Sequence, residues 1–291
     1  MDNEQRSPGS SVSNIKQRLQ RFDNTYAFNM QPIGIVFAIS LKSKAVSRDW
    51  VTVQNNLAKT LRSILHSSDA NFRIVIAGHE KPDIEELKHE YVTWLSVDFP
   101  PPKSFHEFSR DKMSKRKVIG AYLRKIGYTG YFMPLDADDW VHYRFVEFIR
   151  SQPYSDAFVL KKGLMVNLVK DEIWLRRGRF FASCGSSAVY FFSNSDYPLS
   201  AKKPLNKSPF LIVLNNHTRV LQHLAQHKKK HQMIDFPFIT WVLAHGDNNS
   251  MLKGRRDNSI SAKNYGATSE KFGDWLYDYF KIRGTKNDGS L

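Results

Sequence analysis

The sequence predicts an α/β fold, with a doubly wound, mostly parallel central sheet flanked by helices and a mixed second half. Four apolar runs before residue 136 are short and nearly continuous, which is typical of parallel strands covered on both faces. Segments with helical spacing of apolar residues separate these runs, and such alternation implies parallel pairing. After Pro153 the alternation ends, so we expect mixed pairing there.

The elements of the first half follow from the type and spacing of their apolar residues. Val53, Leu57 and Leu61 recur at helical spacing in the first helix, and Gly127 closes the third helical segment. We expect, in order, strand Ile33–Ser40, helix Arg48–His66, strand Phe72–Ala77, helix-prone segment Lys81–Glu90, strand Tyr91–Val97, helix Asp111–Ile126, strand Tyr131–Leu135 and a helix from about Arg144 to Arg150. In such sheets, ligands bind beyond the carboxyl ends of the strands.

The second half is predicted from fewer patterns. We expect strands over Ala157–Leu168 and Ala188–Phe192, a basic turn over Ile173–Arg179, a helix over His217–His227, an apolar segment Phe236–Ala244, a mobile basic stretch over residues 251–265 and a terminal helix over Ser269–Ile282. The expected organisation is a polar, mobile tail over residues 1–30, one domain over 31–265 with halves 31–150 and 151–265, and a C-terminal helix and tail over 266–291.

Composition limits the class of protein and its partners. The chain has 291 residues, of which 41% are hydrophobic, so it can bury a sizeable core. It carries 43 basic and 28 acidic residues, a net charge of +15 that favours polyanionic partners or phosphate-bearing substrates. Cys184 is the single cysteine, so no internal disulfide is possible, and the apolar runs are too short to span a bilayer. We expect a cytoplasmic protein, either soluble or attached peripherally to the inner face of a membrane.

Three carboxylates follow directly on the predicted strand Tyr131–Leu135. Asp136 and Asp138 are two residues apart, so they would point to the same side of an extended chain. Like charges at the end of a buried strand repel one another and are costly to desolvate. A divalent cation that prefers oxygen ligands would offset this cost. The alternative interpretation is a solvated acidic turn.

Three cations lie on the predicted inward side of the helix Asp111–Ile126. The apolar stripe that ends at Ile126, when extended backwards, reaches Lys112, Lys115 and Arg116. The amino end of a helix also favours anions, so these residues and the acidic turn together predict a site for a cation and a phosphate. The alternative is that the two lysines extend to solvent from a frayed first turn.

Taken together, these motifs resemble the glycosyltransferases of the GT-A (Rossmann-like) fold, of the family 2-like type found in bacteria. The resemblance covers roughly residues 32–250 and rests on Phe37–Ser40, Val75–Glu80, Asp111-Lys112 with Lys115-Arg116, and Leu135–Asp139. It implies a metal-dependent enzyme that moves a sugar from a nucleotide-sugar donor to a hydroxyl acceptor, with inversion. The acceptor would be a glycan or a lipid-linked saccharide, and the net positive charge would help the protein rest on an anionic membrane.

The resemblance also implies roles for the residues that match its motifs. Asp138 would bind Mg²⁺ or Mn²⁺ bridging the diphosphate, and Asp136 would contact the ribose or share the metal through water. Ser40 and Lys42, which follow the first strand, would border the nucleotide. Glu80, which follows the second strand, would accept a hydrogen bond from the base. Arg116, with Lys112, would lie against the base or the phosphates.

The late loop His245–Ser250 would supply a further metal ligand. His245 is the candidate and Asp247 the competitor, whereas His245 could instead serve only as a capping or hydrogen-bonding side chain. Inversion also needs a carboxylate base. Asp235 lies in the expected late region, although it could instead cap a following helix, and Asp139 is the other candidate.

Two alternatives compete with sugar transfer. A nucleotidyltransferase that makes sugar nucleotides normally has a glycine-rich phosphate loop after its first strand, but the segment Ser40–Ala45 contains no glycine. A nucleic-acid-binding protein would explain the charge, but clusters such as Lys228–Lys230 and Arg255-Arg256 are scattered and would leave the acidic turn unexplained. Nucleic acid is therefore not an expected partner.

Overall fold

The computed structural model describes residues 12–23, 32–248 and 260–283 and confirms the predicted fold class. The larger sheet has seven strands: β1 (Ile35–Ser40), β2 (Phe72–Gly78), β3 (Val92–Ser96), β4 (Gly130–Leu135), β6 (Ala157–Leu160), β9 (Ala188–Phe192) and β10 (His231–Ile234). Their order is β10-β6-β9-β4-β1-β2-β3. The strands β1 to β4 pair in parallel, whereas β9 is antiparallel to both β4 and β6.

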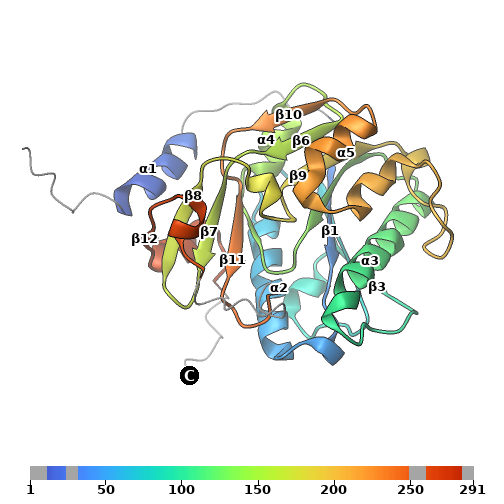
Figure 1. Ribbon diagram of the computed structural model, residues 1–291, viewed down its shortest axis with the longest axis horizontal. Coiled ribbons are helices and arrows are strands. Elements are labelled where there is room, and N and C mark those ends of the chain that lie inside the picture. The colour runs from blue at the N-terminus through green and yellow to red at the C-terminus, as the bar shows by residue number, and fades with distance from the viewer. Residues whose placement is uncertain (1–11, 24–31, 249–259, 284–291) are drawn as a thin grey trace, which may run out of the picture.

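Helices cover both faces of this sheet (Figure 1), as alternating side chains on the strands require. On one face, Phe37 and Ile39 pack with the buried sides of α2 (Trp50–Leu65) and α4 (Phe145–Ser151). On the other face, Val36 and Ala38 pack with α3 (Phe105–Lys125) and α5 (Val220–Gln226). The strand β1 is therefore buried on both sides, which explains its continuous apolar sequence.

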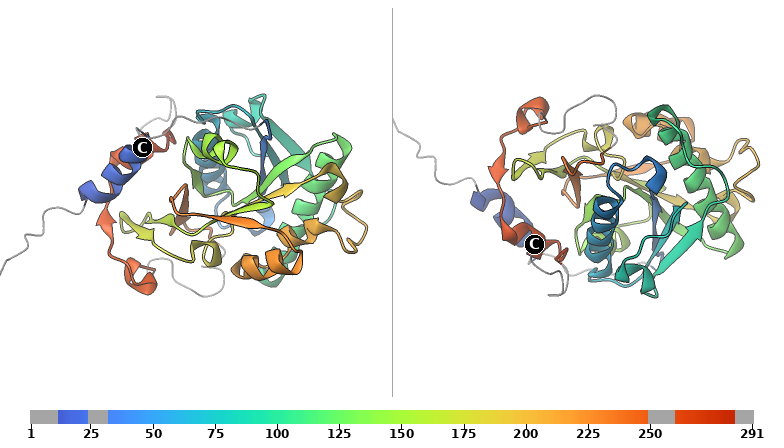
Figure 2. Two further views of the ribbon diagram at one scale, coloured as in Figure 1. Left: turned by 90° about the horizontal axis from the view of Figure 1, so that it is seen from above. Right: turned by 90° about the horizontal axis from the view of Figure 1, so that it is seen from below.

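A second sheet of five strands stands beside the first. It consists of β5 (Trp140–Val141), β7 (Gly163–Asn167), β8 (Glu172–Arg176), β11 (Ile239–Leu243) and β12 (Glu270–Lys271), in the order β12-β8-β7-β11-β5. Ile15 and Leu19 of α1 (Val12–Asp23) pack in one apolar cluster with Leu276 of α7 (Asp274–Tyr279) and with this sheet. Figure 2 shows α1 and the C-terminal segment side by side in both views.

Several predicted boundaries differ from the structure. Residues 12–23 of the expected tail form α1, because Ile15, Leu19 and Phe22 bury one side of it. The expected strand Ala157–Leu168 is two strands in different sheets. The chain turns at Lys161-Lys162 and passes so close to Phe180 that a Cβ on Gly163 would lie 2.3 Å from its ring.

The predicted basic turn is also a strand. It is β8, whose Trp174 is fully buried and whose backbone pairs with β7 and β12. The helix-prone segment Lys81–Glu90 contains only a 3₁₀ helix (Glu85–Lys88), and the predicted terminal helix is shortened to α7 by the pairing of β12. The remainder of the N-terminal tail, residues 251–259 of the basic stretch and the end of the C-terminal tail lie outside the described residues.

The helix α3 begins at Phe105, six residues before the predicted start. Ser104 is extended at its N-cap position, and Phe105 and Phe108 are three residues apart in the first turn, a helical spacing that the predicted helix did not include. Lys112, Lys115 and Arg116 consequently lie within the helix and not at its amino end. The helix dipole therefore does not contribute to their anion binding in the way that the sequence suggested.

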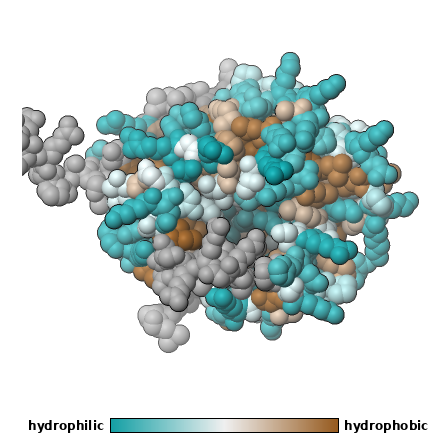
Figure 3. Space-filling model, viewed as in Figure 1, coloured by the Kyte–Doolittle hydropathy of each residue, from teal (hydrophilic) through white to brown (hydrophobic). Residues whose placement is uncertain are grey.

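The surface view in Figure 3 is largely hydrophilic, with hydrophobic residues in separate patches. Across the described ranges, the helices are all too short or too polar to cross a bilayer.

His142 makes the stability of the fold dependent on pH. Its ring is fully buried, its Nδ1 accepts the backbone N–H of Arg144 at 3.1 Å, and its Nε2 is hydrogen-bonded to the hydroxyl of Tyr279 on α7. Burial, helped by the charge of Arg144, lowers the pKa of His142 from 6.5 to about 3. The unfolded chain therefore takes up a proton near pH 6.5 that the folded chain does not take up until about pH 3.

We expect this difference to reduce the free energy of unfolding as the pH falls below about 6.5, by up to ~1.4 kcal/mol per pH unit. Chemical denaturation at pH 7, 6 and 5 measures the slope. The variant His142→Asn has no group that titrates there, so its curve should be flatter by this amount. Parallel curves for the two proteins would contradict the assignment.

Candidate functional site

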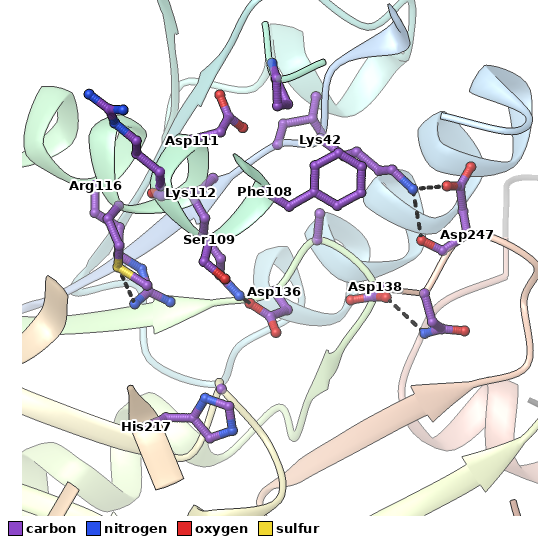
Figure 4. Close-up of a pocket in the computed structure, with 18 of the residues that line it drawn as sticks. Lys42, Phe108, Ser109, Asp111, Lys112, Arg116, Asp136, Asp138, His217 and Asp247 are labelled. Carbon is purple, nitrogen blue, oxygen red and sulfur yellow. Dashed lines mark hydrogen bonds and ion pairs between the residues drawn. The ribbon is translucent and has the colours of Figure 1, made fainter. Parts of the chain in front are cut away.

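A pocket of about 680 Å³ opens at the carboxyl ends of β1 and β4 (Figure 4). Its walls come from the segments after these two strands, the amino-terminal half of α3, the start of α2, the turn at Ser183–Gly185, the segment Leu214–His217, and β11 with the loop that follows it. This is the edge at which doubly wound sheets bind their ligands. Seven of the predicted site residues line it: Ser40, Lys42, Lys112, Arg116, Asp136, Asp138 and His245.

Asp136 lies next to Lys112 in the middle of the pocket. The Nζ atom of Lys112 pairs with Oδ1 of Asp136, and the hydroxyl of Ser40 donates a hydrogen bond to the backbone carbonyl of Lys112 at 3.1 Å. Burial alone would raise the pKa of Asp136, but Lys112, Arg116 and His217 hold it below its usual value. Asp136 is therefore an anion with a cationic partner, and its contact with the ribose, or with a metal through water, stays a prediction.

Asp138 lies next to the late loop, as the sequence analysis expected of a metal ligand. Its Oδ2 is 2.6 Å from Nε2 of His245 and 3.3 Å from the amide nitrogen of Asn248. Asn248 in turn donates to the carbonyl of Val242 at 3.0 Å, which fixes its orientation. The imidazole of the late loop and the carboxylate of the acidic turn therefore lie side by side at the edge of the pocket.

The two side chains have the donor atoms that a divalent ion of the expected kind takes, but Nε2 of His245 and Oδ2 of Asp138 are hydrogen-bonded to each other and would have to separate to hold it. Carboxylate oxygen suits Mg²⁺ and Mn²⁺, and imidazole nitrogen is a further ligand for first-row metals such as Mn²⁺. Among the described residues, no group of three or more His, Cys, Asp or Glu side chains is close enough to hold a metal. An ion here would therefore take its remaining ligands from water and from substrate oxygens, as Mg²⁺ usually does beside phosphates.

Asp247, the competitor of His245, has a structural role. Its carboxylate pairs with Nζ of Lys42, and its Oδ2 accepts the backbone N–H groups of Arg48 and Asp49 at 3.1 and 3.3 Å. These contacts join the late loop to the start of α2 and to the segment after β1. With its side chain only 2% exposed and its oxygens engaged, Asp247 positions the loop and Lys42.

The two predicted bases do not line the pocket. Asp139 is fully buried, and its carboxylate accepts hydrogen bonds from the hydroxyl of Ser186 at 2.5 Å and from the backbone N–H of Val242 at 3.3 Å. Burial, with the neighbouring charges of Asp138 and Asp136, raises its pKa well above the usual value. Its contacts are those of a residue that holds the turn after β4 in place.

Asp235 lies at the end of β10, the outermost strand of the larger sheet. Its side chain is 59% exposed and pairs with Lys162 at 2.5 Å and with Lys161 at 3.5 Å. A strand and not a helix follows it, so it does not act as a helix cap either.

The remaining predicted residues support the pocket from outside or along its wall. Glu80 does not line the pocket. Its carboxylate accepts hydrogen bonds from Ser43 Oγ at 3.0 Å and from the N–H of Lys44 at 2.9 Å, and so holds the segment that follows β1. Lys115 is fully buried and does not extend to solvent. Its Nζ donates to the carbonyl of Leu41 at 2.7 Å and pairs with Asp111 at 2.6 Å.

Arg116 reaches the pocket wall from the inner side of α3. Its guanidinium donates a hydrogen bond to the carbonyl of Val213 at 2.7 Å. The residue as a whole is only 5% exposed. It contributes positive charge close to Asp136, as the lowered pKa of that carboxyl shows.

Other pocket residues were not predicted. Phe108, His217, Trp241 and Asn248 all line it. Trp241 lay within an apolar run and His217 at the start of a predicted helix, so neither position carried a separate signal. The approach of Gly185 to the acidic turn is close, since a Cβ there would lie 3.1 Å from Oδ2 of Asp136.

No protein-family model matches this chain, and no curated protein matches it. Among solved structures, the inositol-1-phosphate CTP transferase from T. maritima gives a TM-score of 0.44 at 12% identity, covering 90% of this chain and 100% of that one. The apo structure of the bifunctional glycosyltransferase WbbM gives a TM-score of 0.29 at 13% identity, covering 71% of this chain and 36% of that one. At these TM-scores neither likeness says what this chain does.

Proposed function

We propose that the protein is a metal-dependent glycosyltransferase that moves a sugar from a nucleotide-sugar donor to a hydroxyl acceptor. The observation that carries the proposal is the arrangement of the acidic turn. Asp138 faces His245, and Asp136 faces Lys112, in one pocket beyond the carboxyl ends of β1 and β4. A pair of metal ligands next to a lysine could bind the two phosphates of a nucleotide-sugar, and the pocket is large enough for the nucleoside at one end of the diphosphate and the sugar at the other.

The proposed roles divide along the pocket. Asp138 and His245 would hold the Mn²⁺ or Mg²⁺ ion, which supplies charge stabilisation for the departing diphosphate. Lys112 and Arg116 add positive charge on the side of α3, where they would neutralise phosphate oxygens. Ser40 and Lys42, which follow β1, would border the nucleotide. Asp136 would contact ribose or sugar hydroxyls through its second oxygen while Lys112 occupies the first.

The acceptor is proposed to enter the pocket along the wall that the second half of the chain forms. Ser183, Gly185 and Asn215 form that wall, and they present backbone and small polar groups of the kind that bind sugar hydroxyls. The proposed acceptor class is a glycan or a lipid-linked saccharide. For the latter, a net charge of +15 would favour contact with an anionic membrane surface.

The experiment that tests the function is a calorimetric screen of UDP-, GDP-, CMP- and dTDP-sugars with and without Mn²⁺. We expect one class of sugar nucleotide to bind in the micromolar range with Mn²⁺ and at least about tenfold more weakly when the ion is removed with a chelator. The free nucleoside diphosphate of the same class is the control for recognition of the sugar. Absence of binding to every member of the panel would refute the proposal.

A further inference from the structure

The acidic side chains that line the pocket are already paired. Asp111 pairs with Lys115, Asp136 with Lys112, and Asp247 with Lys42, while Asp138 faces His245. A carboxylate held by a cation or a metal is a poor acceptor for a proton, because proton uptake would break the pair. Since Asp139 and Asp235 do not line the pocket, a proton acceptor has to come from another residue type.

We propose that His217 is the catalytic base, which accepts the proton of the attacking hydroxyl. This inference rests on the proposed sugar transfer and deepens it. Figure 4 shows His217 projecting toward the pocket from the side opposite Lys42 and Asp111, with Asp136 between them. His217 lies beside Asn215 on the wall where the acceptor is proposed to enter, and a base there can reach the attacking hydroxyl.

The local structure holds the imidazole in place. His217 is the first residue of the 3₁₀ helix η6 (His217–Arg219), and the side chain of Asn216 caps it by accepting the N–H of Thr218 at 3.0 Å. The backbone of Ser183, in the turn that leads to Gly185, lies close enough to the ring to raise its pKa. A ring nitrogen that donates to this backbone would be used for orientation, and the other would be available to a substrate hydroxyl.

The charges around His217 favour its neutral form. Burial, with Lys112 and Arg116 on α3, lowers its pKa, whereas Asp136 and the backbone of Ser183 act in the opposite direction. A neutral imidazole near pH 7 has the lone pair that a base needs.

In the proposed step of sugar transfer, one bond to the anomeric carbon forms as another breaks. The acceptor oxygen forms a bond to the anomeric carbon while the bond from that carbon to the donor phosphate oxygen breaks. The electron pair of the broken bond leaves with the nucleotide, the hydroxyl proton moves to the free nitrogen of His217, and the imidazolium then releases it to solvent.

The test uses the full chain and the sugar nucleotide that binds in the screen, with water as the acceptor. His217→Gln should bind this donor with a Kd within about threefold of the parent value. Its single-turnover rate of donor hydrolysis should fall by about 100-fold or more, because a positioned base contributes this much. The parent rate should fall at acid pH as the imidazole is protonated, and this inflection should be missing in the variant.

Two further variants separate chemistry from structure. Imidazole added to His217→Ala should restore part of the hydrolysis rate, which a purely structural role would not allow. His223→Gln makes the same change on α5, outside the pocket lining, and should hydrolyse the donor at the parent rate. A parent-like rate in His217→Gln, or a loss confined to Kd, would overturn the inference, whereas a parent protein that binds no donor would instead refute the proposed function.

Discussion

Asp138→Asn is expected to raise the Kd for a sugar nucleotide in the presence of Mn²⁺ by about tenfold or more, toward the value that the parent shows in chelator, while donor binding in chelator stays as weak as in the parent. The substitution removes the negative charge that would hold the ion and leaves an amide of the same size beside His245 and Asn248. Loss of one of the two proposed protein ligands should cost at least what the loss of an outer-sphere group costs at other metal sites.

Calorimetric titration of the donor with and without Mn²⁺ measures this effect, and thermal unfolding checks that the fold is kept. Asp98→Asn is the matched control, since it makes the same charge change at a carboxylate that is 69% exposed and outside the pocket lining. If Asp138→Asn binds the donor with the same dependence on Mn²⁺ as the parent, the metal site lies elsewhere.

Asp139→Ala is expected to lower the free energy of unfolding by about 3 kcal/mol, because the buried donors of Ser186 and Val242, and the weaker thiol donor of Cys184, lose their acceptor. The hydroxyl of Ser186 and the N–H of Val242 both donate to this carboxylate, and Ser186 and Asp139 are almost completely inaccessible. Asp139→Asn should change stability by less than about 1 kcal/mol. The amide oxygen can accept the N–H of Val242, and the hydroxyl of Ser186, which can also act as an acceptor, can take a hydrogen bond from the amide NH2 group. Burial next to two negative charges already disfavours the ionised carboxyl.

Denaturant unfolding of the two variants distinguishes loss of the hydrogen bonds from loss of the charge. If Asp139→Ala and Asp139→Asn lower the free energy of unfolding equally, the hydrogen bonds of an uncharged Asp139 side chain are not what stabilises this turn. An intact Asp139→Asn protein with no donor hydrolysis would show that the carboxylate takes part in the reaction, which is the role that the resemblance had suggested for it.

The first half of the fold was predictable because its signals are local. The strands β1, β2 and β4 are buried on both faces and therefore have continuous apolar sequences, and each lies where the sequence placed it. The same holds for the acidic turn, since residues that follow a strand directly are placed by that strand. Asp138 and His245, which the sequence assigned to one site, lie in contact although 107 positions separate them in the chain, and their binding of a metal stays a prediction.

What could not be predicted depends on contacts between distant segments. The sequence of β8 contains Trp174 among basic residues, and only the pairing with β7 shows that its indole is buried. Asp139 and Asp235 looked equivalent as acids in the sequence, yet one is sealed beneath the turn and the other lies on an outer edge. His217 had no distinguishing pattern, because its position in the pocket depends on the turn at Ser183.

The contact between Lys42 and Asp247 has a consequence for how the molecule reaches its working state. The two residues are 205 positions apart, and Asp138 and His245, the proposed metal ligands, are 107 positions apart. Closing such long loops delays folding, so during synthesis on the ribosome the first sheet can form before the cleft is complete. A nascent chain released before about residue 245 would hold a nucleotide-sized hollow without the groups that close it.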